Sequence, residues 1–313
     1  MSKSPVLGLG LDAGGTRTRW ALVDQQGQLL TEGHVAGMGG LQLQTEAGLA
    51  NLRATLQTLA HALGAVAPSQ PLALYGGFTG LGSEQSKSAM LALLREALPI
   101  STRHTTISHD MDIAYRAAFA PGAGYLVYAG TGSVAAFLEA QGQTHLAGGR
   151  GFLLGDDGGG YWIAREALAW VWRQEDRTPG AWKQSPMAQR LFDAVGGSDW
   201  KFTRAFAYGS DRGAMGRLAL QVGASANDDP AAHALLLRAG AALGELAQHM
   251  LHRFGPRPIT AAGRAMLLSP LLETGLRQAL PPDTELRITP DLAAHVTAAR
   301  LAIFDSQIGI QPS

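Results

Sequence analysis

Short apolar runs that end at glycines recur along this chain. The first is Val6–Leu11 and the second is Trp20–Val23, with Gly14–Gly15 between them. Runs of this length predict buried strands, and the glycines predict a tight turn that joins the two strands as a hairpin. A third strand is expected over 28–36, ahead of the glycine-rich stretch 37–40.

Between such runs, apolar residues recur at spacings of three and four. Leucines at 49, 52, 56, 59 and 63 predict an amphipathic helix over 41–63. The same reasoning predicts helices at 83–98, 110–119, 161–173 and 231–252, from Gly263 through Leu280, and at 291–304 with Pro290 at its start. Strands are expected at 72–75, 105–108, 125–129, 134–139, 145–147, 257–261 and 285–289. Strands that alternate with helices indicate an α/β fold.

The second half of the chain opens as the first half does. Tyr125–Ala129 is apolar, Gly130–Ser133 follows, and Val134–Glu139 is apolar-rich again. A chain of 313 residues exceeds a single typical core. We therefore expect two domains, with the boundary at Pro121–Gly124.

Composition narrows the function classes. Twenty-five basic and twenty-five acidic residues leave no net field to attract nucleic acid or an anionic membrane. The absence of cysteine excludes disulfides, thiolate catalysis, iron–sulfur clusters and zinc–cysteine sites. No signal peptide or apolar stretch long enough to cross a bilayer is present, which predicts a cytoplasmic protein. Forty glycines, about twice the usual share, suggest several turns that converge on a ligand.

The first glycine stretch has the residues of a phosphate site. Backbone N–H groups of Gly14–Gly15 can point into one concavity that holds an anion, and the Thr16 hydroxyl with the Arg17 or Arg19 guanidinium adds donors. Asp12 would repel phosphate, so we expect it to hold a hydrated Mg²⁺. The alternative is a tight hairpin with a solvated aspartate.

The second glycine stretch is of the same type. Its members are Gly130, Thr131, Gly132 and Ser133. Neither stretch is a P-loop or a dinucleotide fingerprint, because each leads into a strand. Two such hairpins facing each other across a cleft would hold the phosphates of a nucleotide from both sides. A plain hairpin turn is again the alternative.

Four aspartates are candidates for binding or activating a hydroxyl acceptor. Asp110 lies where a strand ends and a helix begins, and it would accept the proton of a hydroxyl that attacks a γ-phosphate. A helix N-cap is the alternative, Asp112 is the competing candidate, and His109 is expected to be structural. Asp156 and Asp157 lie in a glycine loop that would present them to sugar hydroxyls, or one of them caps the next helix.

These residues together resemble the sugar-kinase/Hsc70/actin superfamily, and within it the BadF/BadG/BcrA/BcrD-type ATPase family, in the branch of N-acetylglucosamine and glucosamine kinases. The resemblance covers nearly the whole chain. It rests on the first phosphate motif Asp12–Arg17, the second phosphate motif Gly130–Ser133, the adenosine motif Ala261–Gly263, and the hexosamine-site stretches 148–151 and 155–164.

The resemblance implies a fold of two ribonuclease-H-like domains with a hinged cleft, commonly as a homodimer. The expected domains are 1–120, 121–290 with a helical insertion, and a closing helix 291–313 that returns towards the first domain. Asp110 would be the catalytic base, and Asp156, the first acid of its loop, would bind sugar hydroxyls. Two departures stand out, since Gly39–Gly40 replaces an asparagine and Ala293–Val296 replaces a glycine-rich helix start.

The resulting hypothesis is a kinase that uses ATP and Mg²⁺ to phosphorylate the 6-hydroxyl of an amino sugar, with N-acetylglucosamine as the first candidate. Cofactor binding is assigned to Asp12, Gly14, Gly15, Thr16, Arg17, Gly130, Thr131, Gly132, Ser133 and Gly263, and Asp12 to the metal. Sugar binding is assigned to Gly39, Gly40, Gly149, Arg150, Asp156 and Asp157.

Four alternative functions compare with the kinase hypothesis as follows. A kinase for glucosamine or another hexose is the nearest alternative, and a non-catalytic sugar sensor is the second, although retention of both Asp12 and Asp110 argues against it. An activator of a radical dehydratase would need cysteines. A repressor would need a DNA-binding segment, and the first strand is expected to begin by Val6.

Overall fold

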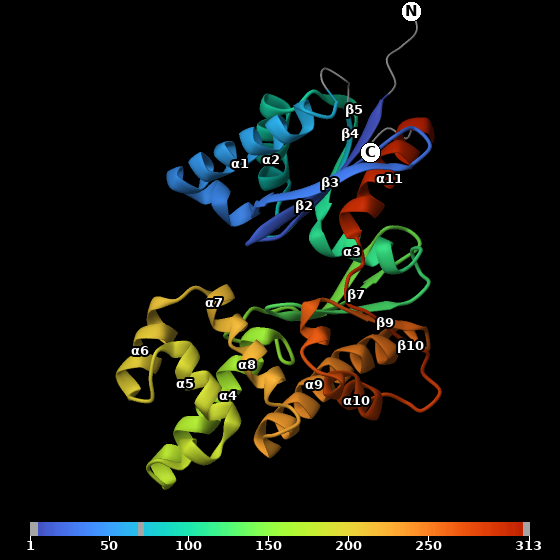
Figure 1. Cartoon of the computed structure of the whole chain (residues 1–313). Coiled ribbons are helices and arrows are strands. Elements are labelled where there is room, and N and C mark those ends of the chain that lie inside the picture. Colours follow the sequence, from blue (N-terminus) through green and yellow to red (C-terminus); the bar gives the residue numbers. More distant parts are fainter. Residues whose placement is uncertain (1–5, 68–71, 309–313) are drawn as a thin grey trace, which may run out of the picture. The chain divides into compact units, whose positions relative to one another are not determined.

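The computed structural model describes residues 6–67 and 72–308, and the chain divides into two compact units (Figure 1). Unit 1 combines the residues up to Ala117 with those from Ala293 onward, and unit 2 is Ala118–Leu292. Residues 1–5 and 309–313 of the expected domain ranges lie outside the described residues.

Unit 1 is built on a five-stranded sheet in the order β3-β2-β1-β4-β5. The strands are β1 Leu7–Ala13, β2 Arg17–Val23, β3 Leu29–Ala36, β4 Leu72–Phe78 and β5 Ile100–His109. β1, β2 and β3 are antiparallel neighbours, whereas β1, β4 and β5 run parallel. The helices are α1 Glu46–Gly64, α2 Glu84–Ala97, α3 Asp110–Ala118 and α11 Ala294–Ile308, with a 3₁₀ turn η1 at Gly40–Gln44.

The two faces of this sheet are covered by different helices. Side chains of a strand alternate between faces, so Leu7, Leu9 and Leu11 of β1 all pack into the core beneath α1 and α2. The helix α11 lies on the other side of the sheet from α1 and α2 (Figure 1). Gly8 and Gly10 face α11. A Cβ on either glycine would overlap backbone atoms of α11, so β1 admits this helix only because both positions lack side chains.

Unit 2 repeats the plan with the order β10-β9-β6-β7-β8. Its strands are β6 Tyr125–Ala129, β7 Ser133–Leu138, β8 Thr144–Gly148, β9 Ile259–Ala262 and β10 Leu286–Thr289. Here β6, β7 and β8 are antiparallel neighbours, and β6, β9 and β10 run parallel. The two halves of the chain therefore share one sheet topology.

The helices of unit 2 fall into two sets. Between β8 and β9 the chain forms α4 Gly160–Arg177, η2 Ala181–Gln184, α5 Pro186–Val195, α6 Trp200–Gly209, α7 Arg212–Arg217, α8 Ala219–Ala224 and α9 Pro230–Phe254. After β9 come η3 Arg264–Leu267 and α10 Pro270–Ala279.

Three predicted elements differ from the observed ones. The helix expected over 41–63 is split, because Thr45 is extended and its hydroxyl accepts the Gly48 N–H to cap α1. The helix expected from Gly263 to Leu280 is broken by a new cap at Ser269. Pro290 does not begin the last helix: its carbonyl accepts the Gly263 N–H at 3.0 Å, and α11 starts four residues later.

The entry to α11 contains a strained residue. Ala293 has a φ of 46°, a left-handed conformation that costs an L-residue about 1–2 kcal/mol. Ala293→Gly removes this strain but adds freedom to the unfolded chain, so we expect a net gain in the free energy of unfolding of roughly 0.5–1 kcal/mol. Chemical denaturation measures the change. Ala294→Gly, one residue further and inside the helix, should instead lower the free energy of unfolding by about 1 kcal/mol. A lower free energy of unfolding in both variants would show that Ala293 is not strained.

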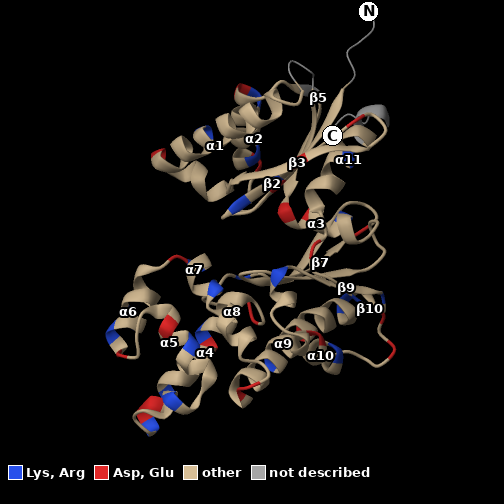
Figure 2. Cartoon of the chain, in the orientation of Figure 1, with Lys and Arg blue, Asp and Glu red and all other residues tan. Residues whose placement is uncertain are grey.

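Charged residues of both signs are interspersed over each unit (Figure 2). Among the residues that the structure describes, none of the helices is long and apolar enough to cross a membrane.

Candidate functional site

In unit 1, the predicted site residues gather at one edge of the sheet. Because β1, β4 and β5 are parallel, their carboxyl ends lie together, which is where open α/β sheets bind ligands. Asp12 is in register with Gly77, and Gly77 with Ser108, two residues before Asp110. Two strand spacings, roughly 10 Å, separate β1 from β5. Asp12 lies near the end of β1 and Asp110 directly follows β5, so both aspartates are at the same edge of the sheet.

The first glycine turn, Gly14–Thr16, joins β1 to β2 and is open at its tip. Gly14 N–H donates to Arg17 O at 3.1 Å to close the turn. Gly15, Thr16 and Arg17 are exposed, and a Cβ on Gly15 would meet nothing within 4 Å. The tip therefore has space for a ligand, as an anion-binding turn requires.

The loop 37–40 is packed directly against this turn. A Cβ on Gly37 would overlap the backbone of Gly15, and Met38 N–H donates to the buried Thr18 hydroxyl at 3.0 Å. Because that hydroxyl has no access to water, the hydrogen bond fixes the loop to β2.

Gly39 and Gly40 can offer only backbone to a sugar. Gly40 N–H donates to Thr79 O at 2.9 Å, and a Cβ on Gly40 would overlap the backbone of Gly80. A larger side chain is therefore excluded at Gly40 by its neighbour. Their assignment to sugar binding stays a prediction.

Asp110 opens α3 beside a histidine. His109 Nδ1 lies 2.6 Å from Asp110 Oδ1, and the two side chains are 45% and 25% exposed. When the imidazole is protonated, Nδ1–H donates to Asp110 Oδ1, so Nδ1 does not accept the Met111 N–H that lies 3.3 Å away. The pKa of His109 is raised, mainly by its hydrogen bond to Asp110. Burial lowers the pKa, the negative charges of Asp110 and Asp112 raise it further, and the positive charge of Lys87 lowers it.

This raised pKa gives a pH-dependent contribution to stability. A histidine whose pKa is higher in the folded state stabilises the fold fully below its unfolded value near 6.5, and the contribution is lost as the pH rises through the folded pKa. We therefore expect His109→Gln to lower the midpoint of thermal unfolding at pH 5.5 and to leave it unchanged at pH 8.5. An equal effect at both pH values would show that the imidazole acts through packing alone.

Asp112, the competing candidate, has a structural role. Its carboxylate is buried, accepts the Tyr75 hydroxyl at 2.8 Å and pairs with Arg116 Nε at 3.1 Å. The bond to Tyr75 joins α3 to β4, and the pair with Arg116 lies within α3.

In unit 2, the second glycine turn, Gly130–Gly132, joins β6 to β7 and packs on the start of α4. Gly160 N–H donates to Gly130 O and Tyr161 N–H to Thr131 O, both at 2.9 Å. A Cβ on Gly159 would overlap Gly132, so a glycine is needed for this approach. The N-terminus of an 18-residue helix therefore lies against the turn, and its dipole favours an anion there.

The two loop aspartates, which are predicted to be presented to sugar hydroxyls, differ in exposure. Asp156 is 4% exposed and has a φ of 63°, whereas Asp157 is exposed. The capping alternative is wrong, because the N-cap of α4 is Gly159. The Asp157 carbonyl accepts the Ser133 hydroxyl at 2.6 Å, which ties the loop to β7.

The buried Asp156 is paired with a residue that the sequence analysis missed. Arg212 Nη2 donates to Asp156 Oδ2 in an ion pair that spans 56 positions of sequence. Arg212 is the first residue of α7, a short helix in the insertion, and no motif around it signals this partner.

Three further predicted residues of unit 2 are Gly263, Gly149 and Arg150. Gly263 follows β9 with a φ of 97°, and a Cβ there would overlap the backbone of Ala129, directly before the second glycine turn. Gly149 has a φ of 64° and begins an exposed loop with Arg150. Gly263 is thus placed beside the turn, while Arg150 contributes an exposed cation.

The donors present suit magnesium held mainly by phosphate and water. The part of the chain that the structure describes has no group of three or more acidic or histidine side chains that would hold a metal alone. Mg²⁺ commonly uses one or two carboxylates together with substrate phosphates. Asp12, next to the open first glycine turn, matches that pattern.

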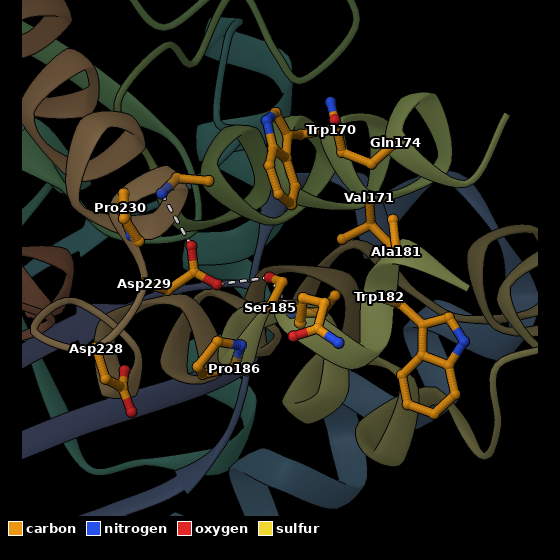
Figure 3. A pocket seen from close by; sticks show the side chains of 13 residues that line it. Trp170, Val171, Gln174, Ala181, Trp182, Ser185, Pro186, Asp228, Asp229 and Pro230 are labelled. Carbon is orange, nitrogen blue, oxygen red and sulfur yellow. Dashed lines mark hydrogen bonds between the residues drawn. The ribbon is translucent and has the colours of Figure 1, made fainter. Parts of the chain in front are cut away.

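A separate cavity of about 320 Å³ lies in the helical insertion, walled by Trp170 and Trp182 (Figure 3). The buried Asp229 on its lining accepts the Ser185 hydroxyl at 2.5 Å and the N–H groups of Met187, Ala231 and Ala232. With both oxygens occupied, this carboxylate joins the starts of α5 and α9.

Two sheets of this order, each with a glycine turn between its first two strands, define the two-domain fold of the sugar-kinase/actin-like ATPases, as expected from the sequence. The structure is similar, with a TM-score of 0.73 and 24% identity, to a protein from Chromobacterium violaceum described as a candidate N-acetylglucosamine kinase, covering 96% of this chain and 99% of that one. A ROK family glucokinase from Streptomyces griseus, solved with glucose and AMPPNP, has a TM-score of 0.59 and 14% identity, with 96% and 99% coverage.

Residues 9–278 match the model of the BadF/BadG/BcrA/BcrD ATPase family, and the chain belongs to this family. Among curated proteins, a glucosamine kinase from Vibrio cholerae serotype O1 is 30% identical over 152 residues. That alignment covers 49% of this chain and 50% of the relative, so it spans about half of the relative's length.

Proposed function

We propose that this protein transfers the γ-phosphoryl group of ATP to the 6-hydroxyl of an amino sugar, with N-acetylglucosamine as the acceptor. The observation that carries the proposal is one edge of the unit 1 sheet, where Asp12 near the end of β1, the open first glycine turn and Asp110 directly after β5 lie at the carboxyl ends of parallel strands, with β4 between β1 and β5. An anion site, a metal-binding carboxylate and a base are the parts that phosphoryl transfer to a hydroxyl needs.

In the proposed reaction, Asp110 accepts the proton of the sugar hydroxyl. The hydroxyl oxygen forms a bond to the γ-phosphorus, the bond from that phosphorus to the β–γ bridging oxygen breaks, and its electron pair remains on ADP. The glycine turns and Gly263 bind the nucleotide, and a Mg²⁺ ion held through Asp12 neutralises phosphate charge when bound.

Asp156 is proposed to orient the sugar, with Asp157, Gly149, Arg150, Gly39 and Gly40 as further contacts. Support for an amino sugar comes from the hexosamine-type loop around Asp156 and from the kinases named among the relatives and neighbours. Glucosamine is the second candidate, since the curated relative is a glucosamine kinase. We further propose that the enzyme works in the cytoplasm as a homodimer.

The test is ADP release measured with a panel of hexoses and hexosamines at fixed ATP and Mg²⁺. N-acetylglucosamine should give the highest kcat/KM, and the product should carry phosphate on O6 by NMR. A higher kcat/KM for glucosamine would reassign the acceptor. No stimulation by any sugar would favour a sensor that binds without turnover.

A further inference from the structure

Arg212 lies where the two proposed subsites of unit 2 meet. A Cβ on Gly132, the last residue of the second glycine turn, would overlap Arg212 Nη2 and come within 2.5 Å of Asp156 Oδ2. The guanidinium and the carboxylate are therefore in direct contact with the backbone of the turn. A phosphate on the turn and a sugar on Asp156 would both be within reach of one guanidinium.

The helix that carries Arg212 is held against the same turn. Asp211 caps α7 by accepting the Ala214 N–H at 2.6 Å. A Cβ on Gly216, one turn further along the helix, would lie 3.0 Å from Thr131 Cγ2. Arg212 is thus positioned by packing of its helix on the turn, in addition to its pairing with Asp156.

The pair is asymmetric in exposure. Asp156 is 4% exposed, whereas the Arg212 side chain is 43% exposed. A guanidinium has five N–H donors, and within the described residues Asp156 is its hydrogen-bond acceptor, with the Phe152 ring 5.9 Å away. Arg212 therefore retains donors for a ligand while Asp156 neutralises its charge.

We propose that Arg212 stabilises the transferred phosphoryl group. We further propose that Asp156 keeps Arg212 paired, and away from that group, until an acceptor sugar binds. This inference rests on the proposed kinase function. Sugar hydroxyls that bond to Asp156 compete for the carboxylate and free the guanidinium, whose planar donors match phosphate oxygens. The freed charge then stabilises the transition state of the transfer. Without sugar, Arg212 stays paired, which slows transfer of phosphoryl to water.

The sharpest test is ADP release without any sugar, compared between wild type, Asp156→Asn, and the double variant Asp156→Asn with Arg212→Gln. Asp156→Asn frees Arg212 permanently, so we expect sugar-independent ADP release to rise about tenfold. The second substitution should return it to the wild-type rate or below. No rise in Asp156→Asn, or a rise that survives in the double variant, overturns the inference.

The sugar-dependent reaction gives a second readout. Arg212→Gln should lower kcat about 10²-fold and change the sugar KM less than about tenfold, because the guanidinium acts on the phosphoryl group. A residue that merely holds Asp156 in place would raise KM and leave kcat unchanged. Arg217→Gln, an exposed arginine at the other end of α7, is the matched control and should keep both constants.

Failure of the proposed function gives a different pattern. If no sugar stimulates wild-type ADP release, the kinase assignment fails, while the comparison without sugar still decides whether Asp156 restrains Arg212. Thermal unfolding of each variant checks that the fold is retained.

Discussion

Asp110→Asn should lower kcat for sugar phosphorylation by about 10²–10⁴-fold, because the acceptor hydroxyl loses its general base. The amide is nearly isosteric and keeps hydrogen-bonding capacity, so sugar and ATP should still bind. Steady-state ADP release measures kcat, and calorimetric titration measures sugar binding separately. The separation matters because a base acts on the transition state and contributes little to ground-state affinity.

Asp112→Asn is the matched control, two residues away on the same helix. Its carboxylate is buried against Tyr75 and Arg116 and has no proposed contact with substrate. We expect a lower midpoint of thermal unfolding and a kcat within a few-fold of wild type. If Asp110→Asn also stays within a few-fold while sugar still binds, Asp110 is not the base.

Gly10→Ala should be the most destabilising single methyl addition in unit 1. A Cβ on Gly10 would overlap His295 O and Ala299 N, and backbone atoms of a packed helix cannot rotate aside as a side chain can. Overpacking of this kind costs about 3 kcal/mol. For a cooperative unit of this size that lowers the midpoint of thermal unfolding by roughly 6–12 °C.

Gly64→Ala provides the contrast, because a Cβ there would meet nothing within 4 Å and Gly64 ends α1. Alanine at a helical position should raise stability by up to about 1 kcal/mol. The difference between the two variants isolates the approach of α11 to β1. Equal stability of Gly10→Ala and wild type would mean that α11 does not pack on β1 as closely as described.

The local pattern of residues was sufficient for most elements of the fold. Apolar runs that end at glycines predict the hairpin after Asp12 in unit 1 and the hairpin at Gly130 in unit 2. Both could be predicted because a short buried strand and a tight turn are each encoded by neighbouring residues. The position of Asp110 at the junction of β5 and α3 was also correct, since a change of periodicity marks such a junction.

Predictions from the local sequence fell short where a distant part of the chain bonds to a polar group, as at the Pro290 carbonyl and the Asp156 carboxylate. Pro290 suits a helix start, yet its carbonyl is used by Gly263 and α11 begins later. The glycines around Asp156 predict a loop, and they do not indicate that Arg212 and the second glycine turn contact its carboxylate. No local pattern carries the contact between residues 56 positions apart.

The sequence by itself therefore determined the α/β class, the two glycine turns and the acidic residues beside them, because each depends on a few adjacent residues. Only the tertiary structure decided which of those residues are neighbours. Parallel pairing of β1, β4 and β5 brings Asp12 and Asp110 to one edge, and packing of α7 on the second glycine turn brings Arg212 to Asp156. Strand order and helix packing are set by burial of the whole core, so contacts of this kind follow from the complete fold and not from any one stretch.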